Sequence, residues 1–144
     1  MKKALIGILV LISLSGCIMA PVIGTIQEAG LTESGRQGTL NQALKDFNSA
    51  LFWQNYSQAQ TFAAEEFSKD VREQLSHKKN QGRVVESKIE GVQYLEDSYK
   101  AEVDVAVRIQ NFSTMIVSDQ TEKQVWNFSV YDGWKLQSIS ANEG

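Results

Sequence analysis

The sequence is poor in the residues that build metal sites and disulfides, with one cysteine and one histidine among 144 residues. One cysteine cannot form a disulfide framework, and one cysteine with one histidine cannot supply a structural zinc site. Basic residues are also few, with 14 against 17 acidic residues spread along the chain. Because nucleic-acid binding needs a clustered positive face, we expect no nucleic-acid partner. We also expect no cofactor and no metal.

The composition nevertheless suffices for one packed domain. Hydrophobic residues make up 42% of the chain and charged residues 22%. These proportions and this length are typical of a single globular domain. They argue against a disordered, collagen-like or solenoid protein.

The amino terminus predicts export and lipidation. Lys2 and Lys3 precede an uncharged run from Ala4 to Leu14, which is typical of a signal peptide and too short for a transmembrane span of about 20 residues. The segment Leu14-Ser15-Gly16-Cys17 closely resembles the bacterial lipobox. The resemblance implies cleavage before Cys17 and acylation of its thiol. Acyl chains are then the contact with the membrane.

The alternative for this segment is an uncleaved signal anchor, since apolar residues resume at Ile18. Ser13, Gly16 and Pro21 weaken a continuous spanning helix and favour the lipoprotein. In the familiar sorting rule an aspartate after the cysteine retains a lipoprotein at the inner membrane. Ile18 in that position implies the outer membrane, with the domain facing the periplasm. Cleavage leaves 12 basic against 17 acidic side chains, so anionic lipid is not expected to attract the surface.

The exported chain divides into a tether and a domain. Residues 17–38 contain the only proline and four of the ten glycines, which predicts a lipidated cysteine followed by a flexible tether. The domain is expected over residues 39–144. Residues 1–16 are the predicted signal peptide.

Helical spacing predicts three helices in the first half of the domain. Thr39 or Asn41 is expected to cap the first helix. Gly82 is expected to follow the end of the third. The apolar positions that define the helices are Leu40, Ala43, Leu44, Phe47, Ala50 and Leu51, then Ala59, Phe62 and Ala63, then Phe67, Val71 and Leu75.

Beyond Arg83 the apolar period changes to two, which predicts antiparallel strands. We expect strands over about 85–94, with a bulge at Gly91, and over 99–110. Further strands are expected over about 115–117, 121–131 and 134–139. Asp132-Gly133 predicts a two-residue hairpin between the last two strands.

Helices followed by a hairpin ending in Tyr131-Asp132-Gly133-Trp134-Lys135-Leu136 resemble the nuclear-transport-factor-2-like superfamily. The resemblance covers about residues 39–139. It implies an α+β domain in which a curved antiparallel sheet of three to four strands wraps around the first helix to form a cone. The cone's open end serves as a ligand cavity or a partner surface. A cystatin-like fold shares the order of elements and is the alternative.

Enzymes of that superfamily place a general base on the apolar face of the sheet. Glu86, Glu90, Glu102 and Asp104 alternate with the apolar residues and are expected to face water, so no catalytic residue is predicted. His77 lies among polar residues at a helix end, and a solvated position is expected. The adjacent acids Glu65 and Glu66 are expected to complement a helix dipole rather than to bind a metal.

Aromatic side chains are the remaining candidates for function. Most are expected to pack in the core and around the last hairpin. If some line the mouth of the cone, Trp53, Tyr56 and Trp126 are the first candidates for a small apolar ligand or partner segment.

Together these patterns predict a membrane-anchored bacterial lipoprotein whose domain binds an envelope protein or a small apolar ligand without catalysis. Self-association through the exposed face of the sheet is a further expectation. The alternatives are a small-molecule enzyme of the isomerase, dehydratase or cyclase type and a structural envelope component. An ionisable side chain deep in the cone favours the enzyme.

Overall fold

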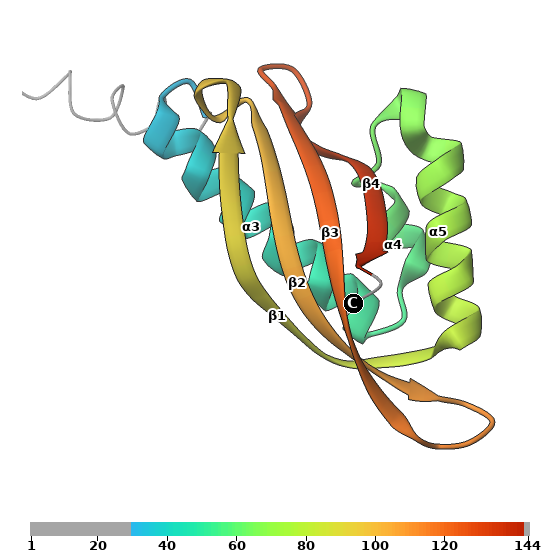
Figure 1. The fold of residues 1–144 in the computed structure, drawn as a ribbon. Coiled ribbons are helices and arrows are strands. Elements are labelled where there is room, and N and C mark those ends of the chain that lie inside the picture. The colour runs from blue at the N-terminus through green and yellow to red at the C-terminus, as the bar shows by residue number, and fades with distance from the viewer. Residues whose placement is uncertain (1–29, 143–144) are drawn as a thin grey trace, which may run out of the picture.

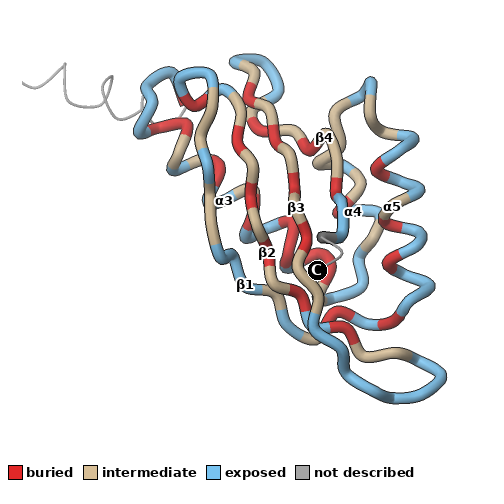
Figure 2. Tube along the Cα trace, viewed as in Figure 1, coloured by how far each residue is buried: buried red, intermediate tan, exposed pale blue. Residues whose placement is uncertain are grey.

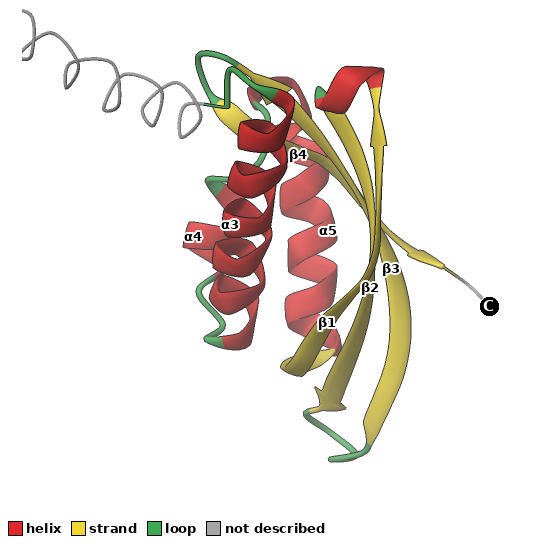
Figure 3. Cartoon of the chain, turned by 90° about the vertical axis from the view of Figure 1, so that its left-hand side faces the viewer, coloured by secondary structure: helices red, strands yellow, loops and turns green. Residues whose placement is uncertain are grey.

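The computed structural model describes residues 30–142 and shows an α+β domain, as predicted (Figure 1). The predicted signal peptide and Cys17 lie outside these residues. Three helices lie on one face of an open antiparallel sheet with strand order β1-β2-β3-β4 (Figure 3). The elements are α3 (Glu33–Phe52), α4 (Tyr56–Gln60), α5 (Ser68–Gln81), β1 (Gly82–Leu95), β2 (Lys100–Asn111), β3 (Val117–Ser129) and β4 (Gly133–Asn142). None of the helices in residues 30–142 is long and apolar enough to cross a bilayer.

Helix α3 begins six residues before the predicted start of the domain, so residues 33–38 are helical rather than part of a tether. Thr32 is the N-cap, and its Oγ1 accepts a hydrogen bond from the amide of Gly35 at 3.1 Å. Thr39, the predicted cap, lies inside the helix, where its hydroxyl donates to the carbonyl of Gly35 at 3.1 Å. Polar residues and glycines suggested a linker, but tertiary contacts of Arg36 override that local signal.

Arg36 is buried and ties the start of α3 to the turn between β1 and β2. Its guanidinium donates to the carbonyls of Asp97, at 2.6 Å, and Ser98, at 3.2 Å. It also donates to the carbonyls of Gly30 and Leu31 and lies over the ring of Tyr99. Because charge-assisted bonds to backbone satisfy the cation, no carboxylate is needed to bury it.

The strands follow the predicted alternation with two corrections. The predicted strands over 115–117 and 121–131 are one strand, β3, and Met115 lies in the preceding turn with φ +58°. In the β3–β4 hairpin, Ser129 pairs with Gly133, which leaves a loop of residues 130–132 instead of two residues. Gly133 takes φ +70° there, a conformation that glycine adopts without strain. The predicted bulge at Gly91 is confirmed by a register shift between Ile89 and Gly91.

The core lies between α3 and the inner face of the sheet (Figure 2). Phe47 of α3 packs edge-on against Trp126 of β3, with ring centroids 5.6 Å apart. Phe62 packs edge-on against both rings. These three rings form one aromatic cluster of the core. Each buries a large apolar area, and edge-to-face packing adds to that stabilisation.

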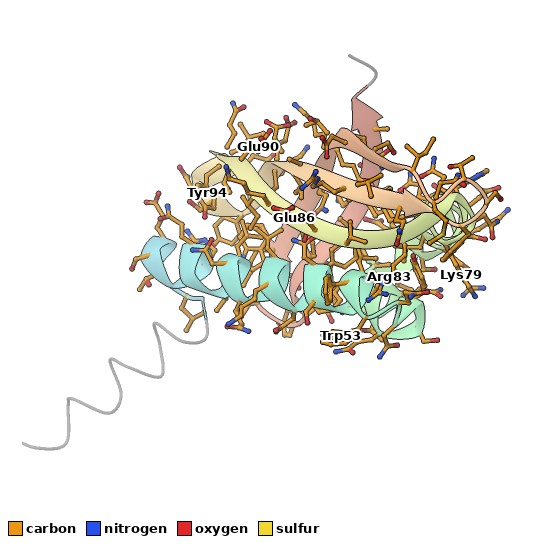
Figure 4. All side chains as sticks on the ribbon, turned by 90° about the horizontal axis from the view of Figure 1, so that it is seen from below. Trp53, Lys79, Arg83, Glu86, Glu90 and Tyr94 are labelled. Carbon is orange, nitrogen blue, oxygen red and sulfur yellow. The ribbon has the colours of Figure 1, made fainter. Side chains whose placement is uncertain are left out.

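The β4 edge of the sheet is covered. The amide of Leu136 donates to the carbonyl of Phe62 at 2.7 Å, and the amide of Ala64 donates to the carbonyl of Leu136 at 2.9 Å. Further along, the amide of Ile139 donates to Oε1 of Gln74 on α5 at 2.8 Å. Strand β1 forms the opposite edge, and α3 runs beside it (Figure 4).

Candidate functional site

The structure does not bring the three predicted pocket residues together. Trp126 is completely buried in the core, and its Nε1 donates to Oε1 of Gln124 at 3.1 Å. Trp53 is the C-cap of α3, with 71% of its surface exposed. Tyr56 opens α4 and is half-buried against the core. The correction concerns Trp126 above all, because core packing uses the whole indole ring.

The acids expected to face water do so on the outer face of the sheet. Arg108 donates to Glu86 at 3.1 Å and to Asp119 at 2.9 Å. Lys123 lies 3.3 Å from Glu102 across the same face. These exposed pairs contribute little to stability individually. They make the outer face charged, with alternating signs.

His77 and the pair Glu65-Glu66 lie on the surface. His77 is exposed on α5, and both glutamates are exposed in the short 3-10 helix Glu65–Phe67. Within residues 30–142 no group of three or more histidine, cysteine or acidic side chains is arranged to hold a metal ion.

A buried ion pair was missed by the sequence reasoning. Lys78 of α5 donates to Oε1 of Glu122 on β3, and both side chains are almost completely buried. Nε2 of Gln120 donates to the same oxygen at 3.1 Å. Burial lowers the pKa of Lys78 to about 8. Counting back by twos from Trp126 places Glu122 on the inner face, and this alternation was the available signal.

The buried pair satisfies only one of the two oxygens of the Glu122 carboxylate. Lys78 occupies Oε1 of Glu122, while Oε2 has no hydrogen-bond partner within residues 30–142. Neither residue lines the cleft or the groove described next. A charge pair buried in this way fixes how α5 lies on the sheet, because separating it leaves an uncompensated charge.

The β3–β4 cleft, of about 730 Å³, lies between β3, β4 and the segment 63–66 and is lined by apolar and polar side chains, among them Asn127, whose Oδ1 is also buried without a partner among the described residues. Its charged residues are Glu65, Glu66, Asp132 and Lys135. Lys135 is already engaged, since its Nζ donates to the carbonyl of Thr61 at 3.0 Å. The cleft is therefore bordered by exposed acids, whose charge is solvated without a ligand.

A second depression, the α3–β1 groove, combines apolar side chains with one buried polar atom that has no hydrogen-bond partner among the described residues. It measures about 490 Å³ and is lined by Lys45, Asn48, Ser49, Phe52, Val85, Glu86, Ser87 and Ile89. Ile89 pairs with Val105, which is buried on the inner face, yet Ile89 itself is 38% exposed. The groove thus leaves apolar surface of the inner face uncovered at the β1 edge.

Asn48 is the most informative residue of the groove. It is only 8% exposed, and its Oδ1 has no hydrogen-bond partner among the described residues. A buried polar atom without a partner costs about 1–3 kcal/mol, so such groups are rare in stable proteins. Because this oxygen is itself enclosed, a donor on a bound molecule reaches it only when the Asn48 amide turns toward the groove.

The backbone edge of β1 borders the groove beside these side chains. As an edge strand, β1 has N–H and C=O groups on one side that no other strand pairs. Register shifts at Val84/Glu86 and at Ile89/Gly91 interrupt its ladder on either side of the groove residues. The arrangement of an open backbone edge beside apolar side chains fits an extended peptide segment, whose own backbone can continue the sheet.

Comparison with known proteins adds little to this picture. Neither a known protein family nor a curated protein sequence matches the chain. Among solved structures, the intermembrane-space region of the chloroplast protein ARC6 is similar, with 13% sequence identity and a TM-score of 0.41. The match covers 69% of this chain and 94% of that one.

Proposed function

We propose that this chain is a lipid-anchored protein of the bacterial envelope whose domain binds an extended segment of a partner protein in the α3–β1 groove. The anchor is Cys17 in the lipobox-like segment Leu14–Cys17, and Ile18 favours the outer membrane. The periplasmic domain acts by binding rather than by catalysis. A tethered domain meets envelope partners at high effective concentration, so it needs no high intrinsic affinity.

The observation that carries the proposal is that Asn48, the exposed Ile89 and the unpaired backbone edge of β1 border the same groove. The buried Oδ1 of Asn48 lacks a donor, while Ile89 and the β1 backbone offer apolar and hydrogen-bonding surface at the same place. A peptide that lies along β1 can donate hydrogen bonds through its backbone amides and can place alternate side chains against the apolar surface of the groove.

The alternatives are less well supported by the same geometry. An isomerase-type enzyme needs an ionisable group that a substrate reaches, and the interior carboxylate of Glu122 is held by Lys78. Self-association through the outer face would place the Glu86–Arg108 and Lys123–Glu102 pairs against a second copy. We also propose that the domain belongs to the nuclear-transport-factor-2-like superfamily, with a cystatin-like fold as the alternative.

Lipidation is tested by mass spectrometry of the protein from its own membrane fraction. We expect a chain that begins at Cys17 and carries acyl groups. Cys17→Ser is the matched control and should leave the chain without them. A native chain that begins at Met1 with a free thiol would refute the anchor.

Groove binding is tested with a phage-displayed library of linear peptides selected on the full chain carrying Cys17→Ser. We expect selected peptides to shift NMR signals of residues 45–52 and 85–89, and Asn48→Leu to abolish their binding. Val130→Ser, which changes an exposed apolar residue far from the groove, is the control and should bind normally. Peptides that shift only the signals of the β3–β4 cleft around Asp132, or that bind Asn48→Leu equally well, would refute the groove.

A further inference from the structure

The hairpin between β2 and β3 ends in an apolar tip, residues 112–117, that projects beyond the helices (Figure 1). Four of its side chains are exposed to between 44% and 65%: Phe112, Met115, Ile116 and Val117. Isolated exposed apolar residues are ordinary, but four on one short turn are not. The tip contributes none of the residues that line the α3–β1 groove.

No charge interrupts this surface. Residues 111–118 carry no acidic or basic side chain. Next to the tip, Arg83 pairs with Gln110 in the β1–β2 register, while Arg108 and Asp119 form an ion pair at 2.9 Å and Arg108 also binds Glu86. Their charges therefore largely compensate one another. The tip itself is neutral and apolar.

The tip is an ordered turn. Oδ1 of Asn111 accepts hydrogen bonds from the amides of Ser113 and Thr114, at 2.8 and 3.0 Å. The Asn111 backbone bonds to Met115 and Ile116, and its Nδ2 donates to the carbonyl of Gln81 in α5. The apolar side chains are therefore held outward by a preorganised backbone, which lowers the entropic cost of binding.

Met115 is one of five non-glycine residues of the described chain with a positive φ, and the only large apolar one among them. Its φ of +58° lies in the left-handed region, which glycine or asparagine adopts with less strain. A large apolar side chain therefore occupies a position where it strains the turn. Strain of this kind is found where a side chain has a role outside the fold.

We propose that the β2–β3 hairpin tip inserts into a lipid surface, as a second membrane contact besides the acylated cysteine. A convex apolar tip encloses no ligand and needs a medium that accepts it without a matching cavity, which the interface of a bilayer provides. With no basic residue on the tip, insertion depends on apolar burial and not on anionic lipid.

The proposal rests on the proposed lipid anchor for bringing the tip to the membrane. The start of α3 and the tip lie at opposite ends of the domain (Figure 1). The 20 residues of α3 span about 30 Å. Residues 18–29, between Cys17 and the described chain, reach at most about 40 Å when extended. The domain can therefore lie along the membrane with both points in contact.

The test uses the full acylated chain, purified from membranes and reconstituted in phosphatidylcholine vesicles. Ile116→Cys and Tyr131→Cys each receive a nitroxide label, the second at the exposed β3–β4 loop. Collision rates with oxygen, which enriches in lipid, and with a water-soluble nickel chelate then report immersion. We expect a severalfold higher oxygen-to-nickel ratio at residue 116 than at residue 131. A label at Phe112→Cys should lose its immersion when Met115→Ser and Ile116→Ser are added.

Three results would overturn the insertion. Equal nickel access at residues 116 and 131 would show a tip in water. Shielding of residue 116 from both oxygen and nickel would show burial in protein. Dipolar broadening between labels at residue 116 would show pairing of two copies. Failure of the anchor itself is distinguishable, because an unacylated Cys17 takes up a second label that mass spectrometry detects.

Discussion

The two edge strands of the sheet differ in whether their outer backbone groups are hydrogen-bonded. At β4 the backbone of Leu136 is paired by residues 62–64, and the amide of Ile139 is bound by Gln74. At β1 the backbone borders a groove in which the Oδ1 of Asn48 has no partner. An open edge risks aggregation, and bulges with charged neighbours such as Glu86 and Glu90 reduce that risk. This difference is the basis of our proposal that β1 is open for docking, whereas β4 is closed by contacts within the domain.

The largest effect on the free energy of unfolding is expected from removing the buried pair that fixes α5 on the sheet. Lys78→Ala should lower the free energy of unfolding by about 3–5 kcal/mol, because it removes the amine that donates to the buried carboxylate of Glu122, a hydrogen bond that the side chain makes in either protonation state. Lys79→Ala, the exposed neighbour, should change it by less than about 0.5 kcal/mol. Urea denaturation measures both, and equal effects would show that the pair does not hold the helix.

The same lysine predicts an alkaline rise in stability. Burial lowers the pKa of Lys78 to about 8 from its usual 10.5. Above pH 8 the folded chain therefore loses this proton while the unfolded chain keeps it, so stability rises with pH by up to about 1.4 kcal/mol per unit. The difference between the native chain and Lys78→Met should show this slope from pH 8 to 9.5. A flat difference over that range would contradict it.

The range from pH 8 to 9.5 ends below the pH at which the tyrosines lose their protons. Burial raises the pKa of Tyr56 and of Tyr94 above 10. Above pH 10 the unfolded chain ionises these phenols first, which lowers the stability of both proteins alike. Comparing the native chain with Lys78→Met removes this shared contribution.

A smaller effect on the free energy of unfolding is expected when one amide of strand β4 loses its hydrogen-bond acceptor. Gln74→Ala leaves the amide of Ile139 without its acceptor and should lower the free energy of unfolding by about 1–2 kcal/mol. Hydrogen exchange at Ile139 should become faster. Gln42→Ala, on the exposed face of α3, is the control. Unchanged exchange at Ile139 would mean that Gln74 does not close the edge.

The smallest effect has the opposite sign and concerns the open edge. Asn48→Leu replaces an unsatisfied buried amide with an apolar side chain of similar size, so the free energy of unfolding should rise by about 1 kcal/mol. Thermal unfolding measures this gain. Destabilisation by Asn48→Leu would show that the amide already has a partner in the free domain.

The α+β order, the helical faces and the strand alternation could be predicted because they depend on local periodicity. The positions Leu40, Leu44 and Phe47 repeat on one face of α3, and all are buried. The strand from Lys100 to Asn111 alternates as expected. Burial against a single core enforces these periods, so the sequence carries them directly.

The features that were missed depend on contacts between distant residues. Arg36 binds carbonyls 61 and 62 residues away, so the start of α3 resembled a linker. Lys78 and Glu122 are 44 residues apart in sequence. The groove at Asn48 arises because α3 leaves part of β1 uncovered, and no local pattern encodes that spacing. Long-range packing therefore decides the candidate site.

Hydrogen exchange of the full chain in the membrane fraction to which we propose that it is anchored tests the central claim most directly. Compared with the detergent-purified chain, amides of residues 85–89 in β1 should be protected in the membrane, whereas those of Leu136 and Ile139 in β4 should be unchanged. Asn48→Leu should abolish the protection. Equal exchange of β1 in the two preparations, or protection that survives Asn48→Leu, would contradict docking at the open edge.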